Sequence, residues 1–223
     1  MTVHRYLLTA TALTTSVFFL VPGAQAQTPP FDWSGFYAGF SLGGAGGKTD
    51  FTFDGVTPAY AAVPTMGSDG AITGGVNFQN GAFVYGLAAD GSLLSVNGSG
   101  PAGGGTADTA LDRLFAMRAR LGLASDRLLF FSTAGLAVGH ETFTTDIDNW
   151  VGSYPAHADG VVLGTTYGVG MEVALSDQVS LTAEGLVTNL GPITATGDTG
   201  RGPYQAEARS HTLNLRGGVN FHL

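Results

Sequence analysis

The sequence predicts an all-β protein, a transmembrane, eight-stranded, antiparallel up-and-down β-barrel. Three observations predict this fold. Eight segments alternate apolar with small or polar residues, short connections alternate with long ones, and only 12% of residues are charged. Glycine is abundant, at 35 of 223 residues, but 44% of the residues are hydrophobic and they recur with a period, so the composition does not indicate disorder.

The first 26 residues are predicted to be a secretory signal peptide, which leaves residues 27–223 as one barrel domain. Arg5 precedes an apolar run over residues 7–21, and Ala24-Gln25-Ala26 supplies the small-x-small pattern that signal peptidase recognises. A retained membrane anchor is the alternative, although the run is shorter than the ~20 residues that a spanning helix needs.

The remaining chain is acidic and contains no cysteine. Eight Lys and Arg residues stand against 17 Asp and Glu, which gives a net charge of −9. This balance argues against a nucleic-acid partner, because binding to phosphates needs a basic surface. An exported chain without cysteine belongs in the periplasm, the outer membrane or beyond, and has no disulfides to stabilise it.

The alternation is clearest between Arg113 and Leu123. Five apolar residues share one face, whereas Arg118 and Arg120 share the other, and a helix would scatter the two arginines through its apolar side. The same alternation recurs in seven more segments, at 35–42, 72–79, 83–93, 128–139, 166–175, 179–188 and 212–221. Segments of about ten residues suit a tilted crossing of a bilayer, whereas strands of a soluble β-sandwich, the alternative, typically have five or six.

Short and long connections alternate along the chain. Short ones are predicted at Asn80-Gly81, Ser125-Asp126 and 176–178, and the first is a typical two-residue hairpin signal. Long loops are predicted at roughly 45–67, 95–109, 140–160 and 191–208, where Gly, Pro, Asp and Thr collect. This layout predicts that both termini are periplasmic and that the long loops are extracellular.

Six charged residues fall on the face that would point into the barrel lumen. They are Asp90, Arg118, Arg120, Glu172, Glu184 and Arg216, three acids and three bases. Because buried charges are costly unless paired, we expect an ion-pair network across the lumen. A structural plug is one interpretation of this network, and a selectivity ring or gate is the other.

No motif predicts a cofactor, a metal site or catalysis. The string from Gly43 to Thr49 ends in Gly-Lys-Thr but lacks the first glycine of a phosphate-binding loop, and it begins a predicted loop. His140-Glu141 and His157 lack the spacing of a ligand cluster. His211 and Ser132 share the outward face, as a lipid-modifying enzyme would need, but lie on distant strands with no outward carboxylate expected beside the histidine. We therefore expect no enzyme activity.

Several segments resemble the Omp25/Omp31-like outer-membrane proteins of alphaproteobacteria, also called opacity-like or porin-family barrels. These segments are Asp32-Trp33-Ser34-Gly35-Phe36-Tyr37-Ala38-Gly39, Val84 to Asp90, Arg118-Ala119-Arg120-Leu121-Gly122, Asp126 to Ala137, Gly168 to Ala174 and Leu213 to Phe221. The resemblance implies an abundant envelope protein with roles in outer-membrane integrity, surface antigenicity and, in some members, haemin binding. The chain departs from the family where a Glu-Tyr pair is usual, at Glu172-Val173 and Glu184-Gly185, and it ends on Leu223 instead of an aromatic residue.

Three functions remain open at this stage. The first is a structural and surface-interaction role with a closed lumen, the second is a narrow porin for ions or small solutes, and the third is ligand binding or adhesion by the acidic loops at 140–160 and 191–208. The expected partners are outer-membrane lipid and lipopolysaccharide, and the barrel assembly machinery during insertion. The sequence names no loop ligand.

Overall fold

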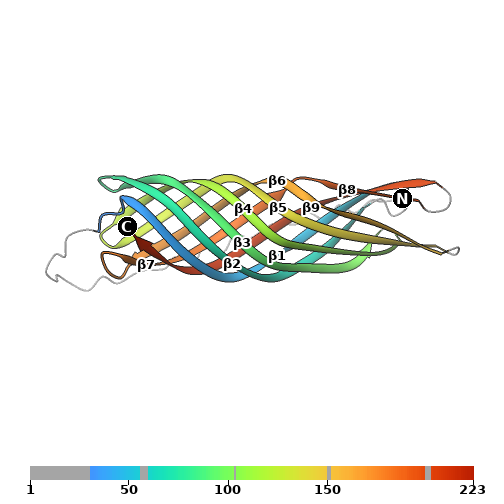
Figure 1. Cartoon of the computed structure of the whole chain (residues 1–223), viewed down its shortest axis with the longest axis horizontal. Helices are drawn as coiled ribbons and strands as arrows, with labels where there is room; N and C mark the ends of the chain where they lie inside the picture. The colour runs from blue at the N-terminus through green and yellow to red at the C-terminus, as the bar shows by residue number, and fades with distance from the viewer. Residues whose placement is uncertain (1–30, 56–59, 103, 150–151, 199–201) are drawn as a thin grey trace, which may run out of the picture.

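The computed structural model describes residues 31–55, 60–102, 104–149, 152–198 and 202–223, and the predicted signal peptide lies outside these residues. The strands are β1 (Gly35–Asp54), β2 (Tyr60–Asn80), β3 (Phe83–Ala102), β4 (Gly105–Ser125), β5 (Leu128–Asn149), β6 (Gly152–Ala174), β7 (Val179–Leu190), β8 (Ile193–Asp198) and β9 (Pro203–His222). Figure 1 shows them winding obliquely around one long axis. Among the described residues, no helix is long and apolar enough to span a membrane.

The strands close into an antiparallel ring with eight strand positions, which confirms the predicted fold. Each strand from β1 to β6 pairs with the next, β7 pairs with β9, and β9 pairs with β1 to close the barrel. β7 and β8 together occupy one of these positions, because both pair with β9 on the same side. The break between them falls at Gly191-Pro192, where proline has no N–H to donate to a neighbouring strand.

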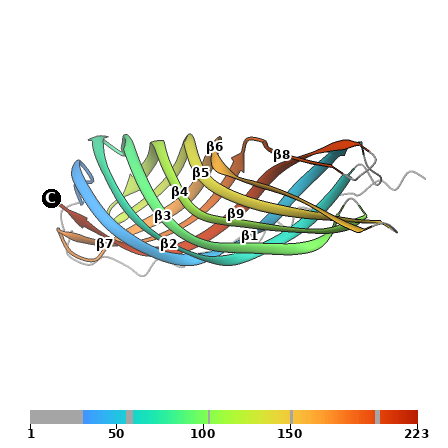
Figure 2. The same ribbon diagram turned by 45° about the vertical axis from the view of Figure 1, so that its right-hand side comes forward.

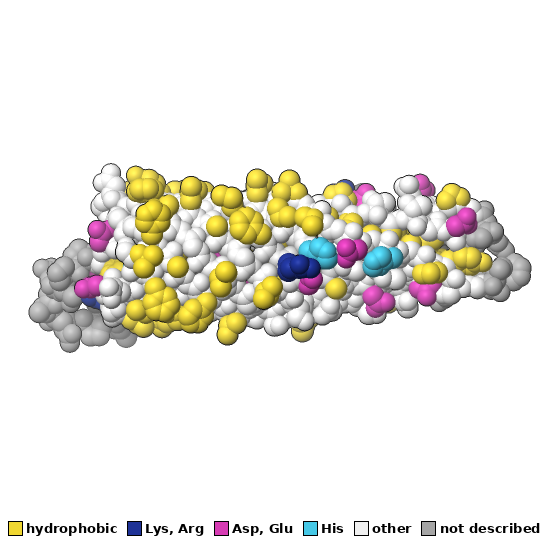
Figure 3. All heavy atoms as spheres, viewed as in Figure 1, with side chains coloured by type: hydrophobic (Ala, Val, Ile, Leu, Met, Phe, Trp, Pro, Cys, Tyr) yellow, Lys and Arg dark blue, Asp and Glu magenta, His cyan; other side chains and the backbone are white. Residues whose placement is uncertain are grey.

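One half of the barrel carries an outer surface of large apolar side chains, which we call the belt. Phe36, Ile72 and Leu215, for example, are 66%, 72% and 62% exposed. Many of the inward neighbours are polar or small, as the alternation predicted: Tyr37, Ser41 and the predicted charged residues are largely buried inside. In Figure 3 these hydrophobic side chains gather over one part of the molecule, and charged groups begin where they thin out.

The predicted long loops are wrong. The regions 45–67, 95–109, 140–160 and 191–208 are mostly strand, because β1 runs to Asp54, β2 begins at Tyr60, and β5 continues to Asn149. The string from Gly43 to Thr49 that resembles a phosphate-binding loop therefore lies within extended β1. These continuations, at 48–54, 60–65, 97–102, 105–112, 140–149, 152–160, 193–198 and 203–211, form the second half of the molecule, which we call the extension (Figure 2).

In the extension the two faces exchange character. Large apolar residues point inward and are buried, among them Phe51, Val63, Phe143, Ile147 and Tyr204, and they pack into one cluster. Most residues on the outer face are polar or charged, although Tyr60 and several prolines are also exposed there. The extension is therefore built like a water-soluble β-structure, with a dry interior and a hydrated surface.

The barrel wall also divides in the extension into two four-stranded sheets. Pairing between β2 and β3 extends only as far as Met66–Asn97, pairing between β6 and β7 ends at Gly164–Leu190, and within the described residues β8 pairs with β9 alone. One sheet contains β8, β9, β1 and β2, and the other contains β3 to β6. Pro64, Pro101 and Pro155 lie on the strands that border these two openings, the edge positions that proline tolerates in a sheet.

Candidate functional site

The six predicted lumen charges come from five strands and all point into the barrel. Asp90 lies on β3, Arg118 and Arg120 on β4, Glu172 on β6, Glu184 on β7 and Arg216 on β9. Each occupies an inward position of its strand, so the same alternation that exposes the belt buries them. Five of them are at most 7% exposed, and the Glu184 side chain is 9% exposed.

Four of the six form a closed group in which acids and bases alternate. Arg118 donates from Nε to Oδ2 of Asp90 at 2.8 Å, and it also pairs with Glu184. Arg216 contacts the same two carboxylates through Nη2, at 3.0 Å from Asp90 and 3.1 Å from Glu184. Thr133 accepts a further bond from Arg118 at 2.9 Å. Two guanidinium groups therefore neutralise two carboxylates, with several hydrogen bonds to each charge.

The other two residues form a separate pair nearer the chain ends. Arg120 pairs with Glu172, whose Oε1 also accepts a hydrogen bond from Asn220 at 2.8 Å and lies 3.5 Å from His222 Nε2. The Arg120 guanidinium lies 3.9 Å from the centre of the Phe131 ring, close enough for a cation–π contact. The six residues thus make two clusters rather than one continuous network.

The barrel interior also contains two acids that sequence reasoning missed, in addition to the three acids and three bases predicted. Asp69 is 2% exposed, accepts a hydrogen bond from Asn214 at 2.7 Å and lies 3.9 Å from Arg216. Glu141 is 1% exposed and accepts a bond from Ser210. Asp69 precedes the predicted second strand, and Glu141 falls in the predicted loop at 140–160. Both residues occupy inward positions of strands that extend further than predicted.

Glu141 lies beyond the belt, because its neighbour His140 is the first ionisable residue on the outer face of β5 and follows the apolar residues Leu136 and Val138. Burial raises the pKa of the Glu141 carboxyl, and the hydrogen bond from Ser210 only partly opposes this. Its Oε2 has no hydrogen-bond partner among the described residues. A neutral carboxyl is therefore favoured at this position.

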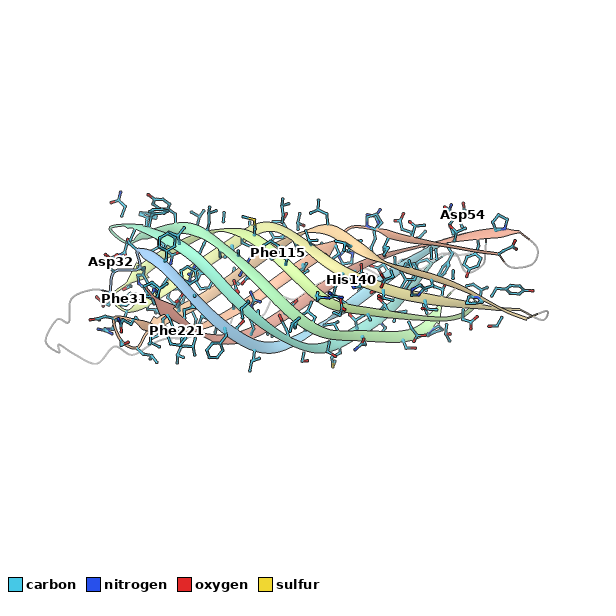
Figure 4. The ribbon with its side chains drawn as sticks, in the orientation of Figure 1. Phe31, Asp32, Asp54, Phe115, His140 and Phe221 are labelled. Atoms are coloured by element: carbon cyan, nitrogen blue, oxygen red, sulfur yellow. The ribbon has the colours of Figure 1, made fainter. Side chains whose placement is uncertain are left out.

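The lumen is filled on both sides of the charged groups. On the side of the chain ends, Phe31, Trp33, Leu129 and Phe131 form an apolar cluster, and Figure 4 places Phe31 with Phe221 at this end and Asp54 at the other. A Cβ added to Gly170 would lie 2.5 Å from the Phe131 ring, so the absence of a side chain there makes room for Phe131 in this cluster. On the other side, a second cluster contains Leu94, Leu111, Leu114, Val162 and Leu190.

Between these two clusters a small cavity remains. Its volume is about 30 Å³, and its lining includes Tyr37, Arg118, Arg120, Glu184 and Arg216. A water molecule needs roughly 10–15 Å³ measured in this way, so the cavity has room for one or two waters. The geometry suits charge-paired packing inside the barrel.

The outer surface does not assemble the metal ligands or the triad considered above. Glu141 points inward whereas His140 and His157 point outward, and no metal-binding group of His, Asp or Glu occurs in the described part of the chain. Two strands, β6 and β7, lie between Ser132 on β5 and His211 on β9.

The expectation that His211 has no outward carboxylate beside it is wrong. Asp50 Oδ2 lies 3.7 Å from His211 Nε2, and Asn189 Oδ1 lies 2.7 Å from its Nδ1. Partial burial acts to raise the pKa of Asp50, but hydrogen bonds from Tyr60 and Lys48 hold it below its usual value. Asp50 is thus an ionised surface group that already accepts hydrogen bonds from Tyr60 and Lys48.

A closed ring of antiparallel strands with an apolar outer belt and a polar, filled interior defines a membrane-spanning β-barrel. The model of the outer membrane protein β-barrel domain matches residues 10–221. The chain belongs to this family of outer-membrane proteins, and its place is the outer membrane.

Individual proteins agree with this assignment. The chain is 29% identical to the 31 kDa outer-membrane immunogenic protein of Brucella melitensis, over 94% of this chain and 92% of that protein. It is also 29% identical to the 22 kDa outer membrane protein of Rhizobium leguminosarum bv. viciae, over 71% of this chain and 67% of that one. These relatives confirm the Omp25/Omp31-like resemblance. The outer membrane protease OmpT of Escherichia coli covers 88% of this chain with a TM-score of 0.52 at 10% identity, a likeness of fold alone.

Proposed function

We propose that the protein is a structural and surface-interaction barrel of the outer membrane whose lumen is closed. The observation that carries this proposal is the filling of the lumen, where two apolar clusters enclose paired charges and a cavity of only about 30 Å³. Ion conduction needs a continuous hydrated path, and side chains occupy this one. The six charges act as a plug that joins five strands.

Conductance in planar bilayers tests the closed lumen. We expect the folded protein to give no steady open channels, and the variants Arg118→Gln and Glu172→Gln to create no ion-selective current. Steady channels whose ion selectivity changes with either substitution would favour the narrow porin and overturn the proposal. The gel mobility of unheated and boiled samples verifies that each protein is folded before it is measured.

The second part of the proposal is that the extension is extracellular and both chain ends are periplasmic. The extension has a polar outer surface and a dry core, as a structure in water requires. The relatives from Brucella are named immunogenic, which supports exposure of such a region at the cell surface. Lipopolysaccharide would surround the extension where it leaves the bilayer, and the barrel assembly machinery would insert the chain.

The absence of cysteine allows a direct test of orientation. Ser99→Cys places a thiol on the outer face of the extension, and Ser125→Cys places one at the end of β4, beside the short β4–β5 turn. On intact cells, a membrane-impermeant maleimide should label the first variant at least ten times more than the second. Both should be labelled equally after lysis, and the reverse pattern on intact cells would contradict the proposed orientation.

The proposal also excludes catalysis. Ser132 donates weakly to the backbone oxygen of Leu121, and His211 contacts Asn189 and Asp50, so neither side chain is directed at the other. A change in lipid A mass when the protein is expressed, lost in His211→Ala, would establish an enzyme instead.

A further inference from the structure

The contact between β1 and β9 closes the ring, and no turn of the chain fixes its register. All other neighbouring positions of the ring are occupied by strands that follow one another in the sequence, and the turn of a hairpin sets its register. β1 and β9, the blue and red strands of Figure 1, pair from Tyr37–His222 to Asp54–Gln205. At this contact the selection of one register is left to the side chains.

β9 presents a row of polar side chains to the barrel interior. Its inward residues along the belt are Ser210, Thr212, Asn214, Arg216, Gly218 and Asn220. Five of these six carry a polar side chain, and each of those five is at most 7% exposed. The last strand therefore carries hydrogen-bond donors along most of the interior, and we call these six residues the β9 row.

Each of the five acids found in the interior accepts a hydrogen bond from the β9 row. The pairs are Ser210 with Glu141, Asn214 with Asp69 (2.7 Å), Arg216 with Asp90 (3.0 Å) and with Glu184 (3.1 Å), and Asn220 with Glu172 (2.8 Å). The acids come from five strands, β2, β3, β5, β6 and β7. Among the described residues, Asp69 and Glu141 accept side-chain hydrogen bonds from β9 alone.

Glycines of β1 make room for the β9 row. The three inward glycines of β1 and the residues that they face are Gly39 with Asn220, Gly43 with Arg216, and Gly47 with Thr212. A Cβ added to Gly43 would lie 2.7 Å from Arg216 Cβ. The relation is reversed once, because Gly218 of β9 faces Ser41, and a Cβ added to Gly218 would lie 2.8 Å from Ser41 Cβ.

A shifted register would lose both kinds of contact. A shift of two residues is the smallest that keeps inward residues inward, and it moves β9 by about 7 Å along β1. In one direction Arg216 would face Ser41 and in the other Ala45, while Gly218 would face another glycine. Asp69 lies on β2 beside β1, so the same shift would carry it out of reach of Asn214.

We propose that the β9 row selects the register in which the ring closes. The native register gives a donor to every interior acid and places Arg216 against a glycine. A buried carboxylate without its donor is costly, so each shifted register is disfavoured at several positions at once. The proposal rests on the ring and its interior contacts, and it is independent of conductance and of orientation in the membrane.

Disulfide cross-linking measures the register, because the chain has no cysteine of its own. Gly44→Cys/Leu215→Cys joins register partners on the outer face, whereas Gly44→Cys/Gly217→Cys and Gly44→Cys/Leu213→Cys join residues that are opposite only after a two-residue shift. Opposite residues lie about 5.5 Å apart and diagonal ones about 7–8 Å, near the limit for a disulfide. After refolding in detergent and mild oxidation, we expect the first pair to cross-link at least ten times more than either of the others. Comparable yields from the three pairs would overturn the proposal.

Exchanging a glycine and an alanine on β1 tests the steric part. In Gly43→Ala/Ala45→Gly, Arg216 faces a glycine only when β9 is shifted by two residues. The yield of the Gly44→Cys/Gly217→Cys pair, relative to that of Gly44→Cys/Leu215→Cys, should therefore rise at least threefold. Gly46→Ala is the control, since its Cβ lies on the outer face and would meet only Thr65 O at 3.8 Å. An unchanged ratio in the exchanged variant would contradict the selection.

Removing donors tests the polar part without adding volume. Ser210→Ala/Asn214→Ala deprives Glu141 and Asp69 of their partners and should also raise the shifted yield at least threefold. Thr188→Ala removes an interior hydrogen bond to Thr166 that involves no acid, and it should keep the native ratio. Gel mobility of unheated and boiled samples shows which variants fold. If the glycine exchange prevents folding, the donor variant decides, and a native ratio there overturns the proposal.

Discussion

The belt and the extension are built from the same strands but place their apolar side chains on opposite faces. On β5, Leu136 and Val138 point outward in the belt, whereas Phe143 and Ile147 point inward in the extension. The surroundings explain the difference. Hydrocarbon outside the belt accepts apolar groups and leaves the lumen to paired charges, while water around the extension drives the apolar groups inside. The same strand thus passes from lipid into water when its apolar residues change from outward to inward positions. It stays paired with β4 and β6 throughout.

The largest effect should come from breaking the charge pairing inside the belt. Arg118→Ala leaves Asp90 and Glu184 buried beside a single remaining guanidinium, and loss of one partner from a buried ion pair typically costs about 3–5 kcal/mol. Urea unfolding of the refolded barrel in detergent measures this loss. Arg209→Ala is the control, since its exposed pair with Glu207 contributes about 0–1 kcal/mol. Equal losses in the two variants would contradict the buried network.

A charge placed on the outer face should distinguish the two regions directly. Leu136→Arg puts a cation against hydrocarbon and should destabilise the barrel by about 2–4 kcal/mol, the cost found near a bilayer midplane. Thr106→Arg, on the outer face of the extension, should change stability by no more than about 0.5 kcal/mol. Unfolding in lipid vesicles rather than detergent is the appropriate measurement. If Thr106→Arg were the costlier change, the division into belt and extension would be wrong.

A smaller effect should follow pH through Glu141. The folded-state pKa is raised by burial, so the folded protein binds the proton more tightly than the unfolded chain does. This contribution to stability is complete below the ordinary pKa of 4.5 and is lost as pH rises through the raised value. Glu141→Gln should remove this loss, which comparison of urea midpoints between pH 4 and pH 8 would detect. A wild type and variant with parallel pH profiles would contradict a buried neutral carboxyl.

The belt could be predicted from the sequence, but the extension could not. Arg118 and Arg120 alternate with apolar residues that all face the lipid. A single pattern therefore predicts both the strands and the inward orientation of the six charges. In the extension the pattern changes phase between Val138 and Phe143, and a sequence pattern that loses its phase is read as the end of a strand. The β4 bulge adds another irregularity, since Asp112 and Arg113 share a face that strict alternation forbids.

The missed site residues follow from the same cause. Glu141 lies within the phase change, and Asp69 lies before the first apolar residue used to recognise β2, so neither belonged to a predicted strand. The division into two clusters was also beyond the sequence. It depends on how far Arg118 and Arg120 rise along the barrel relative to Glu184 and Glu172, which only the strand register fixes.

The two ends of the described chain meet under the barrel. The rings of Phe31 and Trp33 lie 5.1 and 5.7 Å from that of His222, and Leu223 N donates to Phe36 O at 2.9 Å. The last strand therefore completes a contact with the first that spans almost the whole sequence, and contacts of such separation form late in folding. Closure of the ring and packing of the Phe31–Trp33 cluster at its base therefore depend on the same two residues, His222 and Leu223.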